Sequence, residues 1–194
     1  MDDFFSIEDL NEIYNEIESL EDIFKVGDVR NDDTGEIYVN EKYKKNKNIW
    51  LHEHFVNGDS KILKLLRKVW FGKDNIEYLR EHDNPFFSVI TETNYDRTLL
   101  SKYNNGDFYG WHKDGVDSPT ILTLNIFISH EPKFTGGDFV IERNGKSKTI
   151  EFIPNRAVLF PSRTEHMVTE VKEDKHEHLS SRFTIQNWSS LRTK

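Results

Sequence analysis

The sequence predicts an α+β fold in which helices support a double-stranded β-helix, or jelly-roll, core. Apolar residues recur at helical spacing up to about residue 85, and from residue 86 on the pattern changes to period two and to β-branched and aromatic residues. No internal repeat, low-complexity tract or long linker divides the chain. We therefore expect one domain over residues 1–194, with mainly helical support over 1–85 and the β core over 86–190.

The N-terminal part contains two segments with an apolar helical face. The first runs from Ser6 to about residue 25, and Ser6 with Asp9 has the spacing of a capping box, with Asp in place of Glu or Gln. The second covers residues 60–82, with an interruption at Gly72 and a stop before Pro85, because the residue before proline disfavours the helical conformation.

Between these helices, residues 26–48 are polar and include a lysine-rich run. We expect a loop here, with one short strand near residues 37–39. A mobile loop over a substrate and an ordinary exposed connection both fit this composition.

The second part of the chain predicts about eight strands from its alternating and β-branched segments. They are expected at residues 86–93, 97–103, 119–129, 138–142, 148–152, 157–160, 166–171 and 182–187. Gly136-Gly137 is a turn signal, and Asn144-Gly145 between two strands is a strong hairpin signal.

Composition limits the classes of function. The 26 basic and 34 acidic residues give a net charge of -8, which makes nucleic acid an unlikely partner. The chain has no cysteine, so disulfides, thiolate metal sites and cysteine nucleophiles are excluded. The start of the sequence lacks the features of a signal peptide, and no apolar run is long enough to span a membrane. A cytoplasmic protein without membrane association is expected.

His112 and Asp114 have the spacing that places two side chains on the same face of a strand. An imidazole and a carboxylate on one face provide two of the three ligands of the two-histidine, one-carboxylate triad that holds non-haem Fe(II) with open positions. His166 is the candidate for the third ligand, and Arg182 follows as a cationic residue on a later strand.

Other histidines offer alternative ligands. His52 and His54 form a His-x-His pair, as do His176 and His178 within a charged stretch that resembles an exposed hairpin loop. His130 is an alternative to His166. These histidines lack the glycine and aromatic residues that flank His112, so we expect ordinary surface or packing roles for them.

The ordered set of motifs resembles a known family, the Fe(II)/2-oxoglutarate dioxygenases, and within it the prolyl-4-hydroxylase-like group. The matching motifs are Tyr103-x-x-Gly106-x-x-Tyr109-x-x-His112-x-Asp114, Gly136-Gly137-Asp138-Phe139, Val158-Leu159-Phe160-Pro161, His166-x-Val168, and Arg182-x-Thr184 before Trp188. The resemblance covers about half of the chain. It implies Fe(II), 2-oxoglutarate as co-substrate and O2, with ascorbate as an optional reductant.

The resemblance also implies roles for individual residues. His112, Asp114 and His166 would hold the metal and carry the catalysis, and Arg182 would bind the distal carboxylate of 2-oxoglutarate with its guanidinium fork. The interval from His166 to Arg182 is longer than is usual in the group, so Arg163 is the alternative partner for that carboxylate.

Further residues are expected around the pocket. Tyr103 matches a tyrosine whose phenol reaches the co-substrate, although a core tyrosine is almost as good an interpretation. Thr184 would add a hydroxyl beside the guanidinium. Tyr109 would line the substrate entrance, whereas Trp111 should face away from the metal and pack. Asn125 lies on a long strand from which its side chain could enter the pocket.

The expected function is hydroxylation of an unactivated C–H bond, with a prolyl residue of a protein or peptide as the first candidate substrate. An aspartate at position 114 favours hydroxylation, because related halogenases have a small residue there. Substrate choice depends on loops, so a free amino acid, another small molecule or a nucleobase stays open. A non-catalytic metal-binding sensor and a cupin-like enzyme are the alternatives outside this class.

Overall fold

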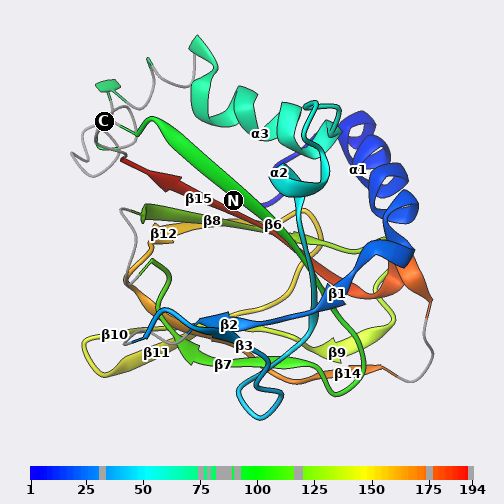
Figure 1. Cartoon of the computed structure of the whole chain (residues 1–194), viewed down its shortest axis with the longest axis vertical. Coiled ribbons are helices and arrows are strands. Elements are labelled where there is room, and N and C mark those ends of the chain that lie inside the picture. The colour runs from blue at the N-terminus through cyan, green and yellow to red at the C-terminus, as the bar shows by residue number, and fades with distance from the viewer. Residues whose placement is uncertain are drawn as a thin grey trace.

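Two antiparallel β-sheets lie face to face, and helices cover the outer side of the larger sheet (Figure 1). The computed structural model describes residues 1–30, 34–73, 77, 80–81, 89, 93–115, 120–173 and 177–191. The strand expected at 86–93 and most of the helix expected after Gly72 fall outside these residues. The jelly-roll core expected from the sequence is confirmed.

The larger sheet has the strand order β1-β5-β6-β15-β8-β12 among the described residues. These strands are β1 Lys25–Val26, β5 Lys47–Trp50, β6 Tyr95–Tyr103, β15 Arg182–Ser190, β8 Thr120–Ile128 and β12 Ala157–Pro161. The long central strands β6, β15 and β8 are buried over most of their length. This accounts for their clear signal in the sequence.

The smaller sheet has the strand order β11-β10-β13-β7-β4. These strands are β11 Lys146–Ile150, β10 Phe139–Arg143, β13 Glu165–Val168, β7 Phe108–His112 and β4 Lys44–Lys45. Two further pairs are β14 Val171–Glu173 with β9 Phe134–Gly136, and β2 Val29–Arg30 with β3 Ile37–Tyr38. The Asn144-Gly145 turn joins β10 and β11 as expected, and both turn residues have positive φ.

The helices are α1 Ile7–Ser19, α2 Leu51–His54 and α3 Lys61–Phe71, with short 3-10 turns at Glu21–Ile23 and His178–Ser180. Ser6 caps α1 by accepting a hydrogen bond from the Asp9 amide, and Ser60 caps α3 in the same way from Leu63. Gly72 ends α3. Helix α1 ends at Ser19, earlier than the expected boundary near residue 25.

The prediction of a loop over residues 26–48 was wrong in part. The short strand near 37–39 is confirmed as β3, but strands β2 and β4 and the start of β5 also lie in this segment. Strand β4 has only two lysines, and its pairing with β7 is a contact between distant parts of the chain. Local sequence carries little signal for such a strand.

The two faces of the larger sheet have different roles. Its outer face packs under α1 and α3 in an apolar cluster that includes Leu100, Ile126 and Ile185. Its inner face meets the smaller sheet at a second cluster formed by Tyr103, Phe127, Phe139, Phe160, Val168 and Val171. The polar side chains that could carry chemistry lie at this inner interface.

No helix of the described residues is long and apolar enough to cross a membrane.

Candidate active site

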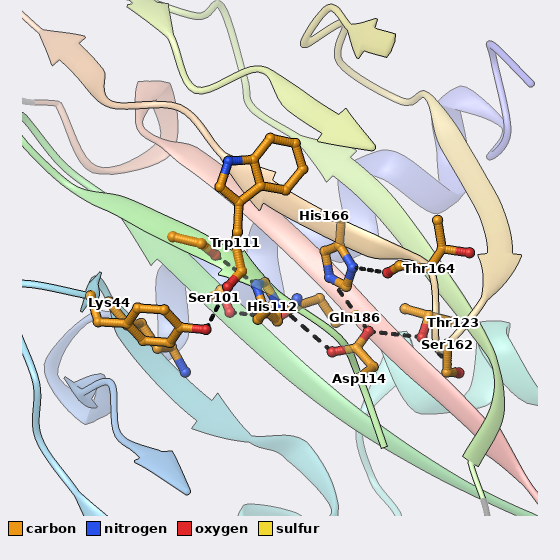
Figure 2. A network of polar contacts seen from close by, with 12 residues as sticks. Lys44, Ser101, Trp111, His112, Asp114, Thr123, Ser162, Thr164, His166 and Gln186 are labelled. Atoms are coloured by element: carbon orange, nitrogen blue, oxygen red, sulfur yellow. Dashed lines mark hydrogen bonds and ion pairs between the residues drawn. The ribbon is translucent and has the colours of Figure 1, made fainter. Parts of the chain in front are cut away.

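His112, Asp114 and His166 converge at the inner face of the smaller sheet (Figure 2). His112 ends β7, His166 pairs with it in register on β13, and Asp114 follows in a turn just after β7. One ligand atom from each lies within 4.8 Å of the others. Within the described part of the chain, this is the group of three such side chains that could hold a metal ion.

Both histidines are held with one nitrogen ready to bind a metal. Nδ1 of His112 lies 2.8 Å from the Gly110 carbonyl, and Nδ1 of His166 lies 2.8 Å from the Thr164 carbonyl. A carbonyl only accepts hydrogen bonds, so each Nδ1 carries the proton and each Nε2 has a free lone pair. Both Nε2 atoms are buried without a hydrogen-bond partner. Burial is the main cause that lowers the pKa of His112 well below its usual value, and the charge of the neighbouring His166 is the second cause. The lowered pKa favours the neutral imidazole.

Asp114 is fixed by β8 and by the chain after β12. Its Oδ2 accepts a hydrogen bond of 2.8 Å from Thr123 Oγ1, and its backbone amide donates to the Ser162 carbonyl at 2.8 Å. Oδ1 lies 3.8 Å from His112 Nε2, and Oδ2 lies 3.7 Å from His166 Nε2. The sequence analysis missed Thr123. Its signal is a polar residue, two before Asn125, inside an otherwise apolar strand.

Arg182 begins β15 and is completely buried. Its Nε donates to the Gly137 carbonyl and its Nη1 donates to Thr184 Oγ1, both at 2.6 Å, while Nη2 has no partner. Burial lowers the pKa of Arg182 to about 10, so the side chain stays a cation at neutral pH. No carboxylate within the described residues forms an ion pair with it. A buried cation of this kind calls for an anionic ligand.

Aromatic rings and a glycine shape the pocket of Arg182. The guanidinium carbon lies 4.6 Å from the ring centroid of Tyr103, and 5.6 Å and 5.3 Å from those of Phe127 and Phe152. Gly137 has φ of +68°, and a Cβ there would lie 2.6 Å from Arg182 Cδ. The second glycine of Gly136-Gly137 is therefore required both for its backbone conformation and for the close approach of the arginine.

The other residues expected near the pocket lie as follows. Tyr103 is 1% exposed under the guanidinium, and burial raises its pKa. The hydroxyl of Thr184 accepts a hydrogen bond from Nη1 of Arg182, so it lies beside the guanidinium. Tyr109 stacks on His112, with ring centroids 3.6 Å apart and 15° between the planes. The expectation that Trp111 packs was wrong, because this side chain is 37% exposed.

A hollow of about 490 Å³ opens beside two of the candidate metal ligands. We call it the mouth. Its lining includes His112 and Asp114 together with five aromatic side chains, which are Tyr43, Trp50, Tyr109, Trp111 and Trp188. Arg163 lines a different hollow, together with residues of the β10–β11 turn. A mouth rich in aromatic rings beside a cluster of polar side chains is typical of a substrate-binding site.

Comparison with known proteins identifies the β core. Residues 98–190 match the family model described as the 2OG-Fe(II) oxygenase superfamily. Over these residues, the chain is similar in sequence to this superfamily. The match contains His112, Asp114, His166 and Arg182, and it confirms the resemblance seen in the sequence.

Curated relatives of this oxygenase core are named PKHD-type hydroxylases. One from Synechococcus sp. (strain CC9605) is 36% identical over 89 residues, which are 44% of this chain and 39% of that protein. One from Parvibaculum lavamentivorans is 32% identical over 89 residues, which are 44% of this chain and 41% of that protein. The chain thus covers about two fifths of the length of these relatives.

Solved structures show the same oxygenase fold over nearly the whole chain. A Pseudomonas putida prolyl-4-hydroxylase has a TM-score of 0.63 and 13% identity, and the match covers 100% of this chain and 91% of that one. A viral collagen prolyl hydroxylase from Paramecium Bursaria Chlorella virus-1, solved with 2-oxoglutarate, has a TM-score of 0.61 and 15% identity, with coverage of 99% and 94%. At these identities, the likeness concerns the fold.

The residues present fit the cofactors of the 2OG-Fe(II) oxygenase family. Two unpartnered imidazole nitrogens beside a carboxylate suit Fe(II) with open coordination positions. The unpartnered Nη2 of a buried Arg182 suits a carboxylate such as the distal one of 2-oxoglutarate.

Among the residues that the structure describes, the rival histidines do not form such a site. His52 and His54 lie on helix α2, where residues two apart do not share a face. His52 Nδ1 accepts a hydrogen bond from the Thr98 amide, and His54 packs against Phe55. His130 lies against Tyr14, away from the three metal-ligating residues, and His176 lies outside the described residues.

Proposed function

We propose that this chain is an Fe(II)- and 2-oxoglutarate-dependent dioxygenase that hydroxylates an unactivated C–H bond of a prolyl residue in a protein or peptide. One observation carries the proposal. Three buried nitrogen atoms between the two sheets have no hydrogen-bond partner among the described residues: Nε2 of His112, Nε2 of His166 and Nη2 of Arg182. Structural roles alone would leave these groups desolvated at a cost of about 1–3 kcal/mol each.

Bound Fe(II) would supply the oxidation of a C–H bond by O2, in which one oxygen atom enters the alcohol and the other enters succinate as 2-oxoglutarate loses carbon dioxide. His112, Asp114 and His166 would hold the metal. Arg182 would orient the co-substrate through its distal carboxylate, and Thr184 would keep the guanidinium fork in place. Tyr109 would hold the His112 ring by stacking and would line the path of the substrate.

The aromatic mouth supports a proline-containing substrate. Pro-rich segments favour the preformed polyproline II conformation and dock into grooves lined by aromatic rings. The names of the structural neighbours, a prolyl-4-hydroxylase and a collagen prolyl hydroxylase, agree with this choice. A free amino acid, another small molecule or a nucleobase is the alternative substrate, and a non-catalytic sensor is the alternative function. The cytoplasmic location expected from the sequence stays a prediction.

The test is succinate formation by the purified chain with Fe(II), ascorbate, O2 and 2-oxoglutarate, with and without a panel of proline-containing peptides. We expect succinate formation to rise with at least one peptide, and that peptide to gain the mass of one oxygen atom. The His166→Gln variant is the control for activity from free iron. Stimulation by amino acids or nucleosides and by no peptide would replace the proposed substrate. Absence of succinate from an iron-loaded chain that binds 2-oxoglutarate and these peptides would contradict the proposed reaction.

A further inference from the structure

A row of side chains crosses the inner face of the larger sheet from Asp114 to an arginine. Arg97 on β6 pairs in register with Trp188 on β15, and Trp188 pairs with Thr123 on β8. Paired residues of antiparallel strands place their side chains on the same face. Thr123 donates its hydrogen bond to Asp114, so the row starts at the metal-ligating carboxylate and ends at Arg97.

The distance between the two ends of this row can be compared with the length of a bound peptide. Neighbouring strands lie about 4.8 Å apart, so Arg97 lies two strands, or about 10 Å, from Thr123. A peptide advances about 3.1–3.3 Å per residue in the polyproline II or extended conformation. A residue that contacts Arg97 would therefore be about three positions from the residue at the metal centre.

Arg97 stacks on an aromatic ring, and among the described residues its guanidinium has no hydrogen-bond partner. Its guanidinium carbon lies 4.1 Å from the ring centroid of Trp50, whose ring lies 5.5 Å from that of Trp188. Stacking on an indole orders the guanidinium without using its N–H groups. In the described part of the chain, no carboxylate forms an ion pair with Arg97. The adjacent Asp96 contacts Asn187 and His52 instead.

The charges around the mouth are unusual for this protein. The whole chain has a net charge of -8, yet the lining of the mouth contains Arg30, Arg97 and Lys113. Lys113 lies 3.9 Å from Glu165, which offsets its charge, and Asp114 belongs to the metal-ligating group. Among the residues that line the mouth, basic side chains therefore outnumber acidic ones, although the chain as a whole is acidic.

We propose that Arg97, held by Trp50 and Trp188, is a subsite for a carboxylate, and that the enzyme selects peptides with an acidic residue about three positions from the target proline. This inference rests on the proposed function, since it assumes a peptide in the mouth. A guanidinium binds a carboxylate through two parallel hydrogen bonds, which gives geometric selectivity as well as attraction.

The test uses short alanine-based peptides with a single proline and one glutamate, placed in turn at each position on either side, and a matched glutamine series. Binding is measured by calorimetry on protein loaded with Mn(II) and 2-oxoglutarate, and hydroxylation by mass spectrometry. We expect one glutamate position, about three residues from the proline, to bind about tenfold more tightly than its glutamine counterpart. This preference should weaken with added salt.

Variants of the arginine decide the assignment. Arg97→Gln should reduce the glutamate preference to about twofold or less, with unchanged affinity for the glutamine peptide and for 2-oxoglutarate. Arg163→Gln, at the other hollow, should keep the preference. Equal binding of both peptide series, or a preference that survives Arg97→Gln, would overturn the subsite while leaving the proposed function intact. Failure of every proline peptide to bind would overturn the peptide substrate and the subsite together.

Discussion

His112 and His166 face each other across β7 and β13, paired in register with ring centroids 4.0 Å apart. Two strands of one sheet thus position two candidate metal ligands, and the turn after β7 adds the carboxylate of Asp114. Sites built on strands hold their geometry better than sites built on loops.

The first prediction concerns the metal. His166→Gln keeps most of the side-chain volume but removes a ligand, so the affinity for Fe(II), measured by anaerobic calorimetry, should fall by more than about a hundredfold. The far-ultraviolet circular dichroism should stay unchanged. His54→Gln, on the exposed face of α2, is the control and should bind Fe(II) normally. Wild-type affinity in His166→Gln would remove His166 from the metal site.

The second prediction concerns the support of Asp114. Thr123→Val has nearly the same shape but cannot donate the hydrogen bond to Oδ2. Loss of such a partner typically costs about 10–100-fold in metal affinity. Thr149→Val, at an exposed position of β11, is the matched control. If both variants bind Fe(II) equally well in the same titration, Thr123 has no positioning role.

The third prediction concerns the co-substrate. Arg182→Lys keeps the charge but loses the fork that reaches Gly137, Thr184 and the ligand, so 2-oxoglutarate should bind about 10–100-fold more weakly at unchanged metal affinity. Calorimetric titration of the Mn(II)-loaded protein measures both constants. Arg163→Gln is the control. An effect in Arg163→Gln and none in Arg182→Lys would make Arg163 the partner of the carboxylate.

The fourth prediction separates stability from binding. Asn125 is 2% exposed, and its side-chain Oδ1 has no hydrogen-bond partner among the described residues. It lies on β8 between Thr123 and Phe127. Thr123 contacts Asp114, and Phe127 contacts Arg182. Asn125→Leu removes this unsatisfied group and should raise the free energy of unfolding by about 1–3 kcal/mol in urea titrations. The same change should weaken 2-oxoglutarate binding. A variant that is less stable and binds 2-oxoglutarate normally would contradict both expectations.

The fifth prediction concerns pH. Burial lowers the pKa of Lys44 from its usual 10.5 to about 8. Between these two values, the unfolded lysine holds a proton that the folded one has released, so stability rises with pH. Relative to Lys44→Met, the metal-free protein should gain up to about 3 kcal/mol across this window. Lys47→Met, at an exposed position of β5, should keep the slope. Equal slopes in urea titrations of Lys44→Met and the unmodified chain would exclude Lys44 as the cause.

The buried strands were predictable, whereas the short edge strands were not. Strands β6, β8 and β15 bury apolar side chains under the helices, so their sequences alternate or run apolar over many residues. Strands β1 and β4 have two residues each, and their pairing depends on distant partners. The end of α1 at Ser19 was missed because apolar residues continue at helical spacing into the following 3-10 turn.

The candidate site was predictable where motifs carry it. The set of His112, Asp114 and His166 follows from spacing and order along the chain. Thr123 and Arg97 could not be found in this way, because their importance depends on which strands lie side by side. The spacing of the pair His52-x-His54 does not distinguish a strand, on which both side chains would share a face, from helix α2, on which they do not.

Strand β15 places Arg182, Thr184, Gln186 and Trp188 at alternate positions on the inner face, and Phe183 and Ile185 on the helix-covered face. Insertion of a single residue after Thr184 would move the amide and the indole into the apolar core and bring apolar side chains into the pocket. An insertion of two residues would keep the faces but lengthen the path from the arginine to the mouth by about 6.6 Å. During evolution, this strand can therefore exchange side chains much more readily than it can change its length.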